Sequence, residues 1–64
     1  MYENIPDILT RKEAQQVLKV SKNTILNFIH DGLLPARIIG NSFRIEKDDL
    51  IEFIQNSQYY NPYR

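Results

Sequence analysis

Four polar side chains recur at helical spacing between positions 22 and 30: Lys22, Asn23, Asn27 and His30. An asparagine amide can hydrogen-bond to both N6 and N7 of adenine, and a lysine ammonium can donate to guanine or to a phosphate. At about 100° per residue, these side chains and Leu26 fan across one side of a helix. We interpret them as candidate contacts to DNA. The alternative is the solvated face of an ordinary amphipathic helix.

Two pairs of cations flank this segment in the sequence. Arg37 and Arg44 lie on either side of a predicted turn, where they would straddle a phosphate or enter an adjacent minor groove. Arg11 and Lys12 open a predicted helix and could hold backbone phosphates. For both pairs the alternative is a solvated surface.

The residue types give no support for catalysis or metal binding. His30 is the only histidine and the chain has no cysteine, so a second metal ligand of either type is missing. A general base would need an orienting partner and a pocket, and the sequence indicates neither. Asp48, Asp49 and Glu52 cluster at the start of a predicted helix, where carboxylates complement the helix dipole. We therefore predict no enzyme, no metal and no cofactor.

The chain has 64 residues, enough for one domain with a small core. We expect no room beside that core for a substrate pocket of about 300 Å³ or more. The absence of cysteine fits a reducing cytoplasm. No apolar run reaches the roughly 18 residues that span a bilayer, and the first residues lack a signal-peptide pattern. These features predict a cytoplasmic protein with no membrane partner.

The formal net charge is zero, but the charges are segregated along the chain. Residues 10–44 carry six Lys or Arg and two Asp or Glu, a net charge of +4. Residues 1–9 and residues 45–64 each carry a net charge of −2. This layout is expected if one face meets phosphates and an acidic helix lies away from them.

Capping signals mark where two short helices begin. Thr10 followed by Glu13 is a capping box that begins a helix over residues 11–18, with Ala14, Val17 and Leu18 as its buried stripe. Residues 19–20 form the turn, and Val20 fills the gap between the helices.

Ser21 is the predicted N-cap of a second helix, from Lys22 to about Asp31, in which Ile25, Phe28 and Ile29 are buried. Gly32 supplies its left-handed C-cap. Ser21 and Thr24 could also reach a phosphate, although capping and packing are their simpler roles.

A β-hairpin over residues 36–45 and a helix over about residues 47–55 complete the elements. With Gly40-Asn41 as a two-residue turn, Ile38 faces Phe43 and Ala36 faces Ile45 on one side, while the arginines pair on the other. A three-residue loop would instead place Ile39 beside Phe43; we favour the first register. The last helix buries Leu50, Phe53 and Ile54.

The predicted domain covers residues 1–55, and residues 56–64 form a predicted flexible tail. This segment contains Tyr59, Tyr60 and Tyr63. Such a tail could dock on a neighbouring copy or on a partner protein; the plainer interpretation is a disordered end.

A series of residues at fixed spacing runs through positions 8–55. They read as L-T, E-A, L-x-V-S-x-x-T-I, G-x-L-P-A, I-G, R-I and D-L-x-x-F-I. The residues concerned are Leu9, Thr10, Glu13, Ala14, Leu18, Val20, Ser21, Thr24, Ile25, Gly32, Leu34, Pro35, Ala36, Ile39, Gly40, Arg44, Ile45, Leu50, Phe53 and Ile54. Together with the element order, they resemble the excisionase family, relatives of the MerR DNA-binding domain. This resemblance implies a mainly α fold with a small β-hairpin, the winged helix-turn-helix.

The resemblance also implies an architectural role, in which several copies bind neighbouring sites on double-stranded DNA, bend it and assist an integrase. Two alternatives remain: a small transcription regulator or plasmid-maintenance protein, and an antirepressor-like protein-interaction module without DNA binding. Family members often carry basic or aromatic residues at the positions of Asn23, Leu26 and Asn27, and a basic residue at that of Ser42. This chain is less cationic at all four, which predicts weak non-specific attraction to phosphates.

Overall fold

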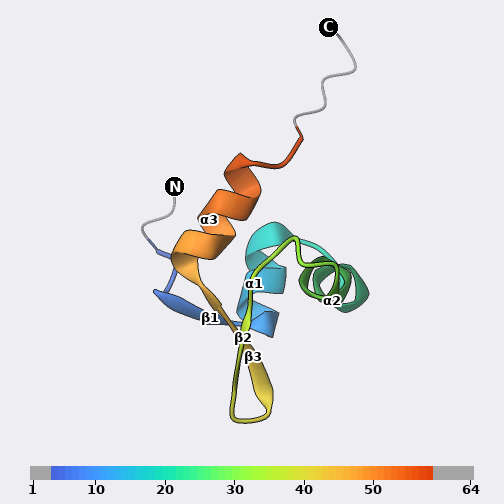
Figure 1. Cartoon of the computed structure of the whole chain (residues 1–64). Coiled ribbons are helices and arrows are strands. Elements are labelled where there is room, and N and C mark those ends of the chain that lie inside the picture. The colour runs from blue at the N-terminus through green and yellow to red at the C-terminus, as the bar shows by residue number, and fades with distance from the viewer. Residues whose placement is uncertain (1–3, 59–64) are drawn as a thin grey trace, which may run out of the picture.

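A computed structural model describes residues 4–58, which form three helices and a three-stranded antiparallel sheet (Figure 1). In chain order the elements are β1 (Ile8–Thr10), α1 (Arg11–Leu18), α2 (Lys22–His30), β2 (Arg37–Ile39), β3 (Ser42–Glu46) and α3 (Lys47–Gln55). The α1–α2 pair, the β2–β3 hairpin and α3 give the predicted winged helix-turn-helix; we call the hairpin the wing. None of the helices in residues 4–58 is long and apolar enough to cross a membrane.

The sheet has the order β1-β3-β2, and its first strand is absent from the sequence-based prediction. Three residues are too few to show an alternating pattern, and the capping box at Thr10 marks only the helix that follows. Long-range contacts create the strand: Leu9 pairs with Ile45, and the backbone N–H of Lys47 donates to the carbonyl of Asp7 at 2.8 Å. The N-terminal segment is thereby tied to the start of α3.

Six fully buried apolar side chains form the core, drawn from all three helices, β1, β3 and the loop before β2. They are Leu9, Ala14, Ile25, Leu34, Ile45 and Leu50. Val20 packs against this core, as predicted for the turn between the helices. Phe28 of α2 and Phe53 of α3 extend it, with ring centroids 5.0 Å apart. The core therefore fixes α2 against α1, α3 and the base of the wing.

The helix ends follow the capping signals. The backbone N–H of Thr10 donates to Glu13 Oε1 at 2.9 Å, and the N–H of Glu13 donates to Thr10 Oγ1 at 3.1 Å, which confirms the capping box. At the end of α2, Gly32 has φ 75°, and the N–H of Leu33 donates to the carbonyl of Phe28 at 3.0 Å. This is the predicted left-handed C-cap.

The wing has the favoured register, with Arg37 opposite Arg44 and Ile38 opposite Phe43. Gly40 has φ 65° whereas Asn41 does not have a positive φ, the pattern of a type II′ turn.

Several apolar side chains are not fully buried. Val17 is 37% exposed because α1 packs mainly through Ala14, and Ile38 is 71% exposed because the wing projects beyond the core (Figure 1). Phe28 and Ile29 are only half-buried. The periodicity of a helix or strand gives the side that faces the core, but not how far the core extends along it.

Candidate nucleic-acid interface

A groove of about 510 Å³ lies between the start of α1, the middle of α2 and the tip of the wing. Its lining residues are Thr10, Arg11, Lys12, Leu26, Asn41, Ser42, Phe43 and Arg44. A second groove, of about 470 Å³, lies between α2 and α3. Both are open grooves that the wing and the helices leave at the surface, and neither is a cavity inside the core.

Three of the predicted site residues, Arg11, Lys12 and Arg44, line the first groove, and none of its lining residues in the described chain is acidic. Arg11 Nη1 donates to Gln15 Oε1 at 2.7 Å, which holds the guanidinium along α1. Arg44 Nη1 donates to the carbonyl of Phe43 at 3.1 Å, which holds it along β3. Three cations around a groove that no carboxylate lines create a positive local potential. This potential suits an anion such as a phosphate.

The polar residues predicted to face DNA from α2 are all exposed: Lys22, Asn23, Asn27 and His30. The His30 ring meets the Phe43 ring edge-on, with centroids 6.2 Å apart and an interplanar angle of 83°. Because this contact joins the last turn of α2 to the wing, it fixes the separation between them. The exposed side of α2 and the first groove thus form one continuous candidate surface.

Ser21 and Thr24 are engaged in capping α2. The backbone N–H of Thr24 donates to Ser21 Oγ at 3.2 Å, and the two hydroxyl oxygens are 2.9 Å apart. Both residues lie at the exposed N-terminus of α2, where a phosphate would find unpaired backbone N–H groups. Their direct contact with DNA stays a prediction.

The two wing arginines have different surroundings. They lie opposite each other in the sheet, but only Arg44 lines the first groove. Arg37 Nε lies 3.5 Å from Glu46 Oε1, an ion pair whose side chains are 70% and 46% exposed. Arg37 is therefore shared between the positive surface and a carboxylate on the neighbouring strand.

Sequence reasoning missed part of the lining of the first groove. Leu26 was placed with the solvated residues of α2, but it is half-buried and packs against the core. Its apolar side chain in the middle of a polar face was the available signal. Asn41 and Ser42 line the groove from the wing tip, and only the three-dimensional arrangement brings them beside α1.

Comparison with known proteins gives a family match. A family model described as a helix-turn-helix domain matches residues 8–58. The Bacillus subtilis (strain 168) protein YvgK, described as uncharacterized, is 36% identical over 53 residues, which cover 83% of this chain and 17% of YvgK. No solved structure shows significant similarity to the chain.

Two Mycobacterium tuberculosis proteins are also similar, MT0521 of strain CDC 1551 / Oshkosh and Rv0500A of strain H37Rv. Their names give DNA binding as a proposed property. Each is 33% identical to this chain over 52 residues, which cover 81% of this chain and 67% of the relative.

Proposed function

The chain belongs to the helix-turn-helix domain family, a non-enzymatic DNA-binding family, and we propose that it places α2 in the major groove of double-stranded DNA with the wing against the adjacent backbone. The observation that carries this proposal is the single surface on which the exposed polar residues of α2 adjoin a groove lined by three cations and no carboxylate. Asn23 and Asn27 would contact base edges, and Arg11, Lys12 and Arg44 would contact phosphates. The names of the mycobacterial relatives support the same activity.

Within this family, the biological role we propose is that of an excisionase, a recombination directionality factor. The residues shared with the excisionase pattern support it, from Leu9-Thr10 to Phe53-Ile54. The size of the domain supports cooperation, because one module of this kind buries roughly 600–1,000 Å² on DNA and gains specificity from neighbouring copies. The proposed partners are therefore DNA, further copies of the chain and an integrase.

The test is fluorescence anisotropy of labelled duplexes titrated with the protein at several salt concentrations. One duplex carries a scrambled sequence and another carries the DNA that flanks the gene. Each neutralised phosphate contributes about −0.9 to the slope of log affinity against log salt, so four to six contacts give roughly −4 to −5. Cooperative preference for the flanking duplex would identify a specific binder.

Mapping the bound sites then separates the possible roles. Sites in recombination arms support the excisionase, whereas sites over a promoter indicate a transcription regulator. A folded protein that binds neither duplex at low salt would contradict DNA binding and favour a protein-interaction module.

A further inference from the structure

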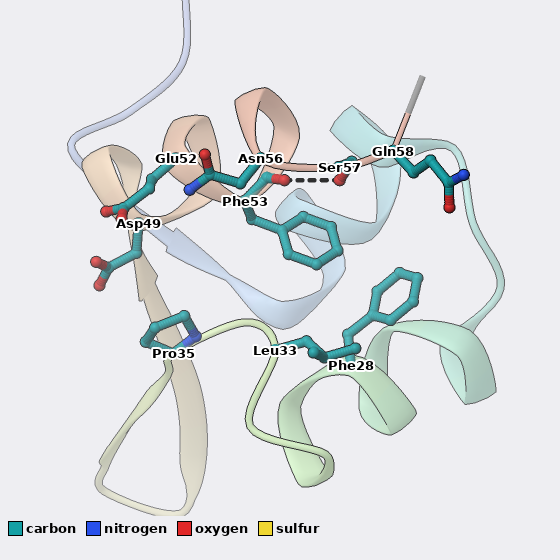
Figure 2. Close-up of a pocket in the computed structure, with 9 residues that line it drawn as sticks. All are labelled: Phe28, Leu33, Pro35, Asp49, Glu52, Phe53, Asn56, Ser57 and Gln58. Atoms are coloured by element: carbon teal, nitrogen blue, oxygen red, sulfur yellow. Dashed lines mark hydrogen bonds between the residues drawn. The ribbon is translucent and has the colours of Figure 1, made fainter. Parts of the chain in front are cut away.

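The second groove, of about 470 Å³, has an apolar floor and an acidic rim (Figure 2). Phe28 and Phe53 pack against each other as part of the floor, and Leu33 and Pro35 continue it along the loop after α2. Leu33 is 60% exposed, so an apolar surface remains open to solvent here. Exposed apolar surface with a polar rim is typical of a site that binds another segment of protein.

This groove lies away from the proposed DNA surface. Around α2, Phe28 is separated from His30 by about 160°, at about 100° per residue. The residues that line the groove include none of the predicted DNA contacts. An occupant here would therefore leave the DNA-binding surface open.

The charges on the rim indicate the kind of occupant. Asp49 and Glu52 lie one turn apart on α3 and line the groove, and no Lys, Arg or His lines it within residues 4–58. Aromatic rings would pair with Phe28 and Phe53, and a cation would pair with the carboxylates. The best complement is a short segment that combines aromatic side chains with a positive charge.

Residues 59–64 of the chain have this composition, with three tyrosines and Arg64 as their only charged side chain. We propose that the groove binds residues 59–64 of a second copy of the chain. Gln58 lies on the groove, but the chain at Ser57 and Gln58 leads away from Leu33 and Pro35 (Figure 2). Because the described chain leads away from the floor at Gln58, we assign the floor to this segment of a second copy and not of the same chain. A mutual exchange would make two identical contacts around a two-fold axis.

The experiment uses the full chain without DNA, so its result does not depend on the proposed function. Sedimentation and amide NMR shifts are measured between ~0.02 and ~2 mM protein, a range suited to a weak interface. We expect reversible dimerisation, with concentration-dependent shifts at Leu33, Phe53 and Asn56. A variant in which Tyr59, Tyr60 and Tyr63 are all replaced by serine is expected to remain monomeric.

Matched substitutions test the groove itself. Leu33→Ser is expected to weaken dimerisation at least about fivefold, because an apolar contact is lost. Ile39→Ser, at a similarly exposed position on the edge strand β2, is expected to leave dimerisation unchanged. The pair Asp49→Asn and Glu52→Gln is expected to weaken it about two- to fivefold, whereas Asp48→Asn, outside the groove, is not.

Three outcomes would overturn the proposal. Shifts at the groove that depend on the tyrosines but not on protein concentration would show that the chain's own segment occupies it. Loss of dimerisation in Ile39→Ser but not in Leu33→Ser would place the interface at the sheet edge. A protein that stays monomeric up to the highest concentration would show that no second copy binds.

Discussion

Arg44 and Asn27 lie on the same candidate surface but are expected to act on DNA in different ways. Arg44 lines the acid-free groove, where its guanidinium can meet a phosphate, and phosphate contacts carry no sequence information. Asn27 is exposed on α2, where its amide can reach a base edge. We therefore expect Arg44 to contribute to the affinity for any DNA and Asn27 to contribute to sequence specificity.

Substituting each of these residues tests the division. Arg44→Ala should weaken binding to all duplexes alike and reduce the magnitude of the salt slope by about 1. Arg37→Ala should have the same kind of effect but a smaller one, because Arg37 also pairs with Glu46. Asn27→Ala should change the preference among sequences, by about 1–3 kcal/mol at the base it contacts. Anisotropy on a panel of single-base variants measures both effects. Unchanged affinity of the arginine variants in low salt would contradict the wing assignment.

Glu46 is expected to lower the affinity for DNA by competing for Arg37. It is the N-cap residue of α3, yet its side chain makes no capping hydrogen bond and instead lies 3.5 Å from Arg37 Nε. Glu46→Gln should therefore leave the fold intact and release Arg37 toward phosphate. Because the pair is largely exposed, its removal should raise the affinity by no more than about fivefold.

The control for this prediction is Asp48→Asn, which removes the same charge from the first turn of α3. If both variants raise the affinity equally, net charge explains the effect and the ion pair does not. A steeper salt slope in Glu46→Gln alone would show that Arg37 gains a phosphate contact.

At the scale of the elements, the turn between α1 and α2 contains a residue with a strained backbone conformation. Lys19 has φ 57°, the left-handed conformation that costs a residue with a Cβ roughly 1 kcal/mol. Lys19→Gly should raise the free energy of unfolding by about 0.5–1 kcal/mol, because glycine adopts this φ without the steric penalty. Denaturant unfolding followed by circular dichroism measures the change. Lys19→Ala removes the same charge but keeps the Cβ, so a gain in that variant would contradict the role of the backbone.

The helices and the wing were predictable because local signals mark them. The Thr10–Glu13 capping box begins α1, Ser21 caps α2, and the Gly40-Asn41 turn sets the register of the wing. β1 was not predictable, since its pairing depends on residues more than thirty positions away. Sequence signals of short range thus determine these elements, while the sheet order emerges only on packing.

At the scale of the whole molecule, the charges that are segregated along the sequence lie on different parts of the surface. Arg11 and Lys12 of α1 meet Arg44 of the wing in the first groove, and Asp49 and Glu52 of α3 lie on the rim of the second. Sequence reasoning identified Arg11, Lys12 and Arg44 individually from their types and positions. Their convergence, the burial of Leu26 and the pairing of Arg37 with Glu46 could not be predicted, because each depends on how separate elements pack.

A domain of this size has little stability to lose, and Leu9 of β1 belongs to its small core. Leu9 is fully buried in the core, whereas its neighbour Ile8 is 54% exposed on the same strand. Leu9→Ala should cost about 2–5 kcal/mol through lost burial and the cavity left behind. For a domain of this length, that corresponds to a drop in Tm of at least about 8 °C. Ile8→Ala is the matched control and should lower the Tm far less.

DNA should restore part of the stability that Leu9→Ala removes, because only the folded protein presents α2 and the wing together. A duplex at a free concentration of 100 times the Kd adds about 2.7 kcal/mol to the free energy of unfolding. Thermal unfolding of the variant with and without a specific duplex tests this linkage. A Tm that rises with duplex concentration would show that binding requires the packed core. An unchanged Tm at saturating DNA would mean that the duplex binds the unfolded chain equally well, which would contradict recognition by the folded surface.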